Sequence, residues 1–157
     1  MSVVIIAVGL VLSSCSETVG TGALHASDLS DAEIAHGHFG AESTSVEAVL
    51  GVTESGCVTV TIDGKVMMPF WPDGTEVEDG RPAAGDYTVD VPGIDPMRVS
   101  VSRGDRFRAL AVIDDGPPFS AAGEGASSGK VAGHHSYCGV DASVLFVDPT
   151  SFAPADS

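Results

Sequence analysis

The most constraining feature of this sequence is a series of short stretches, from residue 46 onward, in which apolar and polar side chains alternate. One stretch is CVTVTI at residues 57–62, and others cover residues 87–91 and 97–101. Alternation with a period of two is typical of strands that bury one face. The longest stretch, RFRALAVI at residues 106–113, places its arginines on one face. These stretches favour a fold built from β-strands.

Residues that form tight turns separate these stretches. Asp63-Gly64 is a strong signal for a two-residue hairpin turn, and Pro72-Asp73-Gly74 predicts a further turn. The chain has 19 glycines and 9 prolines, which argue against a mainly helical fold. We therefore expect an all-β fold, a small antiparallel β-barrel (OB-like) or a sandwich, with about seven strands. We expect residues 119–133, rich in glycine and serine, to form a surface loop.

The N-terminal residues have the pattern of a bacterial export signal. An apolar run at residues 2–12 is followed by Ser13, Ser14 and Cys15. The run is shorter than the roughly 20 residues that a membrane-spanning helix needs, and it has the length of a signal-peptide core. An apolar residue and two small residues before a cysteine resemble the signal of bacterial lipoproteins. In those proteins the peptidase cuts before the cysteine, whose sulfur carries a diacylglycerol.

This resemblance implies that residues 1–14 are a lipoprotein signal peptide and that Cys15 is the lipidated residue. The alternative is a short buried strand in which Cys15 acts as a small apolar residue. Each buried CH₂ of an acyl chain contributes about 0.8 kcal/mol, so several chains anchor a protein without help from basic residues. We expect an extracytoplasmic protein, held on the outer face of the bacterial cell membrane by its lipid.

Composition sets the remaining organisation and the class of partner. Residues 15–45 are mostly small, polar and acidic, so we expect a flexible linker, then a β-barrel domain at residues 46–150 and a tail at 151–157. The chain has 7 basic and 22 acidic residues and a formal net charge of −15. A field of that sign repels nucleic acid. We therefore expect a cell-envelope protein or a small molecule as partner, and no nucleic acid.

With Cys15 lipidated, Cys57 and Cys138 remain as a pair. In an exported chain such a pair favours one disulfide bond. It would close a loop of about 80 residues, to which the chain-entropy model assigns roughly 4 kcal/mol of stability. The alternative is a thiolate metal ligand or a redox thiol, although the sequence contains no CxxC spacing.

Several motifs of the chain resemble those of a family of small actinobacterial lipoproteins of unknown function. They are Gly56-Cys57, Trp71-Pro72-Asp73-Gly74, Gly104-Asp105, the glycine-rich residues 123–129 and Tyr137-Cys138-Gly139. The resemblance covers about residues 54–148. Two local motifs depart from the family pattern, Asp114-Asp115-Gly116 and Val140-Asp141. The resemblance implies an anchored β-domain and supplies no activity.

Four histidines are candidates for a metal site, namely His36, His38, His134 and His135. Histidine is the commonest metal ligand, and two close pairs brought together suit Zn²⁺ or Cu²⁺. All four lie in stretches that we predict as linker or loop, where a histidine is usually just exposed. Extracytoplasmic metal binding is therefore the alternative function, and we expect no cofactor.

Catalysis finds little support in the sequence. Ser136 stands beside His135, but the side chains of neighbours in an extended segment point apart. Trp71, the only tryptophan, is either a packing residue or a platform for a ligand such as a sugar. We therefore expect a binding or interaction module of unknown ligand without enzymatic activity.

Overall fold

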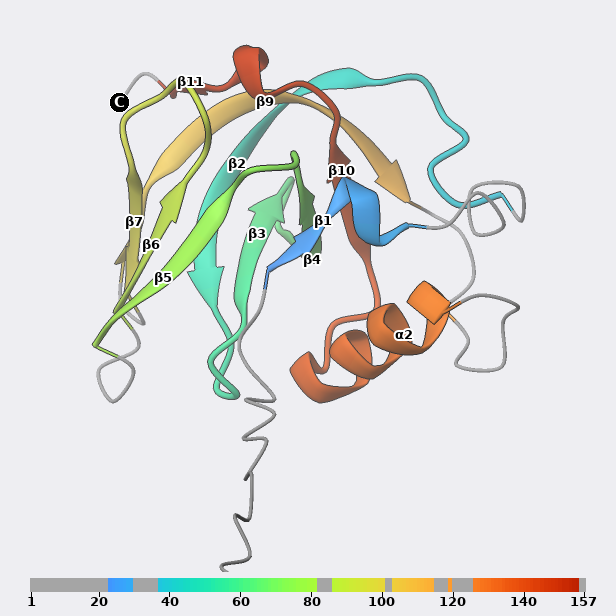
Figure 1. The fold of residues 1–157 in the computed structure, drawn as a ribbon. Coiled ribbons are helices and arrows are strands. Elements are labelled where there is room, and N and C mark those ends of the chain that lie inside the picture. Colours follow the sequence, from blue (N-terminus) through green and yellow to red (C-terminus); the bar gives the residue numbers. More distant parts are fainter. Residues whose placement is uncertain are drawn as a thin grey trace, which may run out of the picture.

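The computed structural model describes residues 23–29, 37–81, 86–100, 103–114, 119 and 126–155. A closed five-stranded β-barrel lies at its centre (Figure 1). Its strands are β2 (Thr44–Val52), β3 (Val58–Ile62), β4 (Lys65–Trp71), β9 (Arg106–Asp114) and β10 (Ser143–Phe146). Around the barrel the order is β4-β10-β9-β2-β3, and β3 pairs with β4 to close it. The expected β-barrel is therefore confirmed.

The predicted hairpin turn lies between β3 and β4. Asp63 and Gly64 have φ angles of 49° and 79°, the left-handed conformations that a type I′ turn needs. Neighbouring barrel strands run antiparallel except β10 and β4, which are parallel. A parallel pair cannot be joined by a tight turn, so the chain must leave the barrel between β4 and β10.

The first excursion from the barrel, between β4 and β9, forms a second sheet. Its strands are β5 (Glu76–Arg81), β6 (Asp86–Asp90), β7 (Met97–Ser100) and β8 (Arg103–Gly104), in that order. Alternation puts Tyr87 and Val89 of β6, with Met97 and Val99 of β7, on the face buried against the barrel core. The outer face therefore carries the polar residues of the same strands.

This four-stranded sheet comes very close to the barrel at Gly104. A Cβ atom at that position would lie 1.8 Å from the carbonyl oxygen of Leu50 in β2. Next to it, the Leu50 amide donates a hydrogen bond to the Asp105 carbonyl over 3.0 Å. Only a residue without a side chain fits this contact, so Gly104 sets how closely the two sheets join.

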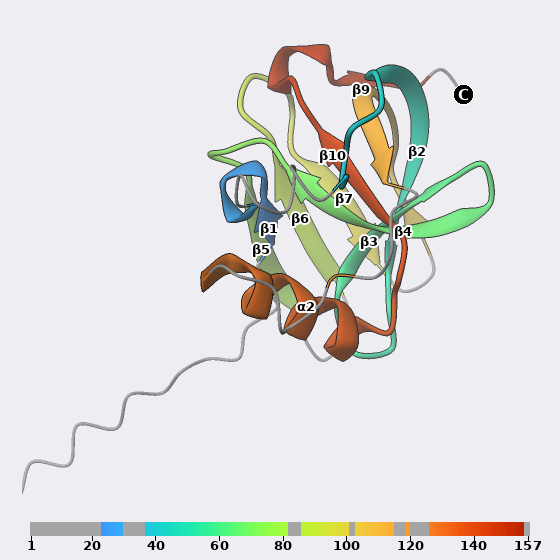
Figure 2. The ribbon, with the colours of Figure 1, turned by 90° about the vertical axis from the view of Figure 1, so that its right-hand side faces the viewer.

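The second excursion, between β9 and β10, contains the helix α2 (Ala126–Cys138), which covers one outer side of the barrel (Figure 2). The predicted loop at residues 119–133 is therefore wrong from residue 126 onward. Glycine and serine are poor helix formers, and tertiary contacts supply what propensity lacks. Val131 is fully buried, Lys130 forms an ion pair with Asp28, and Cys138 ends the helix in a disulfide.

Part of the predicted linker belongs to the fold. Strand β1 (Leu24–His25) pairs in parallel with β4, and Leu24 is 1% exposed. The short 3-10 helix η1 (Ala26–Asp28) follows, and residues 44–45 already belong to β2. At the other end, the 3-10 helix η3 (Pro149–Ser151) leads to β11 (Ala153–Pro154), which pairs with β9 inside the expected tail.

Two apolar cores result from this architecture. The larger one fills the barrel and continues under the four-stranded sheet, and the smaller one lies between the barrel wall and α2. Trp71 is 1% exposed in the larger core, where its ring stacks on Phe146 with centroids 5.3 Å apart. Because this ring is enclosed, the predicted ligand platform at Trp71 is corrected to a packing residue.

Candidate binding site

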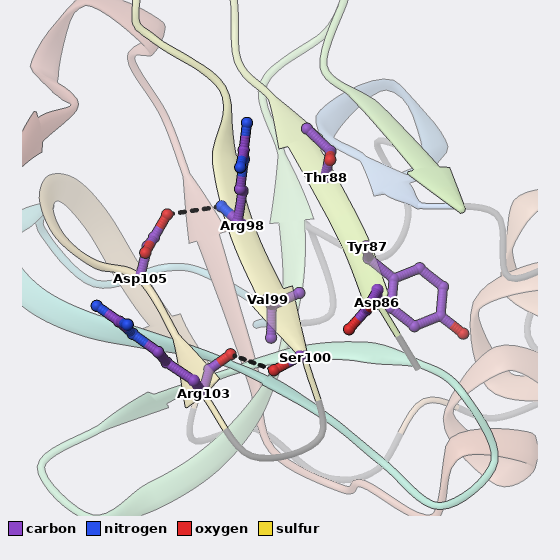
Figure 3. A pocket seen from close by; sticks show the side chains of 8 residues that line it. All are labelled: Asp86, Tyr87, Thr88, Arg98, Val99, Ser100, Arg103 and Asp105. Carbon is purple, nitrogen blue, oxygen red and sulfur yellow. Dashed lines mark hydrogen bonds between the residues drawn. The ribbon is translucent and has the colours of Figure 1, made fainter. Parts of the chain in front are cut away.

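The outer face of the four-stranded sheet carries a polar groove of about 540 Å³. Figure 3 shows the eight residues that line it, from β6, β7, β8 and the following turn. They are Asp86, Tyr87, Thr88, Arg98, Val99, Ser100, Arg103 and Asp105. Tyr87 and Val99 bury their side chains in the core, so the polar residues provide the chemistry of the groove.

Two arginines dominate this groove. Arg98 and Arg103 are both exposed, and neither guanidinium group forms an ion pair or hydrogen bond with the described part of the chain. The chain has only 7 basic residues against 22 acidic ones. Two unpaired guanidinium groups in one groove therefore stand out from the general charge of the molecule.

Asp105 lies between the two arginines and holds the backbone of Arg98 (Figure 3). Its carboxylate accepts a hydrogen bond from the Arg98 amide over 2.7 Å, and its own amide donates to the Arg98 carbonyl over 2.9 Å. The Ser100 hydroxyl donates to the Arg103 carbonyl over 3.3 Å. These contacts hold the β7–β8 hairpin, so both arginines project from a rigid support.

A second groove, of about 890 Å³, adjoins the first and shares Arg103 and Asp105 with it. Apolar residues of the turn before β7 and of β11 line much of it, including Ile94, Pro96 and Pro154. The two grooves therefore meet at Arg103 and Asp105. A ligand that bridges these residues would contact both grooves.

The structure brings His38 and His135 to the same region. His38 stacks on Phe119 with ring centroids 4.1 Å apart, and Phe119 lies 5.2 Å from the His135 ring. Phe119 therefore contacts both imidazoles. His36 lies outside the described residues, and no group of three or more metal ligands among the described residues includes His38 or His135.

Both of these histidines are buried and hydrogen-bonded, unlike the exposed loop residues that we expected. His38 Nδ1 donates to Asp114 Oδ2 over 2.8 Å. His135 Nδ1 lies 2.7 Å from the Val140 carbonyl oxygen, which only accepts, so Nδ1 carries the hydrogen. His135 Nε2 then accepts from the Ser143 hydroxyl over 3.1 Å. Burial lowers the pKa of His135, and the hydrogen bond to Val140 opposes this only in part.

Ser143 and His135 have the contact of a nucleophile and its base, with the Val140 carbonyl orienting the ring. Ser143 is only 1% exposed and His135 only 8%, and neither side chain lines a described groove. Ser136, the serine considered from the sequence, is exposed on α2 instead. The Ser143–His135 contact is thus a buried connection between α2 and β10.

His134, which precedes His135 in α2, lies beside Cys57 and Cys138 instead. One of its ring nitrogens lies within 4.8 Å of the sulfurs of Cys57 and Cys138. These cysteines form the predicted disulfide, which is confirmed with Cα atoms 5.8 Å apart. Burial, together with His135 and Lys130, lowers the pKa of His134. Its imidazole is therefore mainly neutral at pH 7.

Other predicted features fall outside what the structure describes. Cys15 and the expected signal peptide at residues 1–14 are not among the described residues. Among the described helices, none has the length and apolar character needed to cross a membrane.

Comparison with known proteins gives no relative. No protein-family model, no curated protein and no solved structure matches this chain. Function must therefore be argued from the site alone.

Sequence reasoning missed the arginine groove. Alternation in residues 97–101 places Arg98 on the outer face of its strand, and Gly104-Asp105 marks the turn beside Arg103. Those signals identify exposed residues. They do not show that β6, β7 and β8 lie side by side, which is what places the residues in one groove.

Proposed function

We propose that this protein is a lipid-anchored, extracytoplasmic binding module that holds a ligand in the groove of Arg98 and Arg103. The observation that carries the proposal is that both guanidinium groups line one groove without an ion pair to any described residue. Unpaired arginines in a concave site are suited to a carboxylate or phosphate, which they bind bidentately.

The other groups of the groove narrow the class of ligand. Thr88 and Ser100 contribute hydroxyl groups, and Asp86 and Asp105 contribute carboxylates. Carboxylates accept hydrogen bonds from hydroxyl groups and repel a densely charged polyanion. The arrangement therefore fits a ligand with one acidic group and several hydroxyls, such as an acidic sugar.

The position of the groove supports a binding role. It lies on strands rather than on a loop, and sites on regular elements hold their side chains more rigidly. The one serine–histidine contact described above is buried, which supports binding rather than catalysis as the role of the domain. The alternative, a metal held by His36, His38, His134 and His135, has less support. His38 and His135 are hydrogen-bonded to Asp114 and Val140, whereas His134 lies beside the disulfide.

The ligand proposal is tested by titrating ¹⁵N-labelled protein with glucuronate, an acidic sugar, and following amide shifts. We expect saturable shifts at residues 98–105, with glucose much weaker because it has no carboxylate. Arg98→Ala and Arg103→Ala should each weaken binding about tenfold, the value of one lost charged hydrogen bond. Arg108→Ala, an exposed arginine outside the groove, is the matched control. Unchanged binding in the Arg98→Ala/Arg103→Ala variant would contradict the proposal.

The anchor has a separate test. Mass spectrometry of the membrane fraction should find a chain that begins at a diacylated Cys15. An unmodified Cys15, or a mature chain that still carries Met1, would exclude the lipid anchor without affecting the groove.

A further inference from the structure

The junction between α2 and the turn before β3 places three metal-binding groups together. The sulfurs of Cys57 and Cys138 and a ring nitrogen of His134 all lie within 4.8 Å of one another. His134 and Cys138 are four residues apart on α2, a spacing that puts two side chains on one helix face. In the disulfide state the sulfurs are bonded to each other and are not thiolate ligands.

We infer that reduction of the Cys57–Cys138 disulfide opens a three-ligand site for Zn²⁺, formed by both sulfurs and a His134 nitrogen. The inference is independent of the proposed sugar groove. Two thiolates and one imidazole are a known donor set for zinc, with a fourth position left to water. Breaking the S–S bond lets the two sulfurs separate to the nearly 4 Å that tetrahedral bonds of about 2.0–2.3 Å require. The His134 nitrogen already lies within 4.8 Å of both sulfurs.

The reduction step balances with a dithiol as reductant. The Cys57–Cys138 S–S bond breaks, the dithiol becomes a disulfide, and its two electrons and two protons leave two thiols in the protein. Zn²⁺ then displaces both thiol protons to solvent. The bound unit is electrically neutral, since two thiolates balance the charge of the ion.

Both cysteines have supports that do not depend on the disulfide. The turn before β3 is closed by hydrogen bonds from the Thr53 amide to the Cys57 carbonyl (2.9 Å) and from the Cys57 amide to Thr53 Oγ1 (3.0 Å). On the helix side, His135 is hydrogen-bonded to Val140 and Ser143, and Val131 is fully buried. Reduction therefore leaves the backbones of Cys57 and Cys138 close to their present positions, while their sulfurs separate to nonbonded distance.

His134 is available as a ligand. No hydrogen bond joins its ring to any other described residue, unlike the rings of His38 and His135. It lines a small cavity of about 10 Å³ together with Cys57, Leu24 and Met68, so its ring and the side chain of Cys57 border the same space. The neutral imidazole is the form that a metal binds.

The inference is tested on the full chain by adding Zn²⁺ before and after reduction with a water-soluble phosphine, which unlike a dithiol competes weakly for zinc. We expect about one equivalent bound by the reduced protein and none by the oxidised protein, measured against a chromogenic chelator. Co²⁺ in place of Zn²⁺ should give a thiolate-to-metal charge-transfer band.

Variants separate this site from nonspecific binding. Cys57→Ser should abolish binding, and His134→Ala should weaken it at least tenfold. Ser136→Ala, on the exposed side of α2, and Cys15→Ser should leave the affinity unchanged. Equal binding by the oxidised protein, full affinity in His134→Ala, or loss of the circular-dichroism signal on reduction would each overturn the inference.

Discussion

The barrel carries two additions, and they are attached in different ways. The four-stranded sheet joins through apolar residues of its inner face and the close contact at Gly104. Helix α2 joins through a disulfide, a buried Ser143–His135 hydrogen bond and a smaller apolar core. The attachment of the sheet therefore depends on close packing. The attachment of the helix depends on a disulfide and hydrogen bonds, which redox conditions and pH can change.

The largest expected effect concerns the helix. Replacing both disulfide cysteines, Cys57→Ala/Cys138→Ala, releases a link between positions 81 residues apart and should cost about 4 kcal/mol of unfolding free energy. Urea unfolding followed by the fluorescence of Trp71 measures it. Because this variant has no thiolates at the junction, added Zn²⁺ should not restore the loss. If the variant loses less than about 1 kcal/mol of unfolding free energy, α2 is held mainly by its noncovalent contacts.

A smaller effect is expected where the sheet meets the barrel. Gly104→Ala forces a Cβ atom against the Leu50 carbonyl, and overpacking of this kind costs about 1–3 kcal/mol. The matched control is Gly133→Ala in α2, where a Cβ atom would meet no atom within 4 Å. This substitution should stabilise the helix by up to about 1 kcal/mol, because alanine has a higher helix propensity than glycine. Wild-type stability of Gly104→Ala in the same urea experiment would show that the two sheets can move apart.

The smallest effect is a difference in pH dependence between the two additions. The pKa values of His134 and His135 are lowered from 6.5 in the folded protein, so the unfolded chain binds more protons as the pH falls below about 6.5. Stability from these groups is complete above that pH and declines below it. Amide hydrogen exchange at pH 7.5 and 5.5, corrected for intrinsic rates, should show protection lost in α2 before the four-stranded sheet. Equal loss in both would contradict the distinction.

The sequence predicts the sheet-forming part of this fold far better than its helix. Alternation and the Asp63-Gly64 turn identify the strands because both signals are local. Residues 126–138 lack a local helix signal, since glycine and serine fill much of the segment. Their helix depends on tertiary contacts instead. Val131 is fully buried, His135 is hydrogen-bonded to Ser143 in β10, and the disulfide partner of Cys138 lies 81 residues away.

The cysteines and histidines show the same difference between what local sequence predicts and what distant contacts decide. The paired cysteines follow from counting, given an exported chain, and the structure contains their bond. The histidines read as exposed from sequence because a polar residue between glycines and serines suggests a loop. His38 and His135 are buried instead, because Asp114 and Ser143, which are paired across β9 and β10, supply their hydrogen-bond partners.

The short distance in sequence between Cys15 and the first described residue limits how far the proposed anchor lets the domain lie from the membrane. Eight residue steps separate Cys15 from Ala23, the first described residue (23 − 15). A fully extended chain covers about 3.5 Å per residue, so those steps span at most about 28 Å, less than the thickness of a bilayer with its head groups. With the proposed lipid at Cys15, the domain would be held low over the membrane, where only ligands close to that surface come within range.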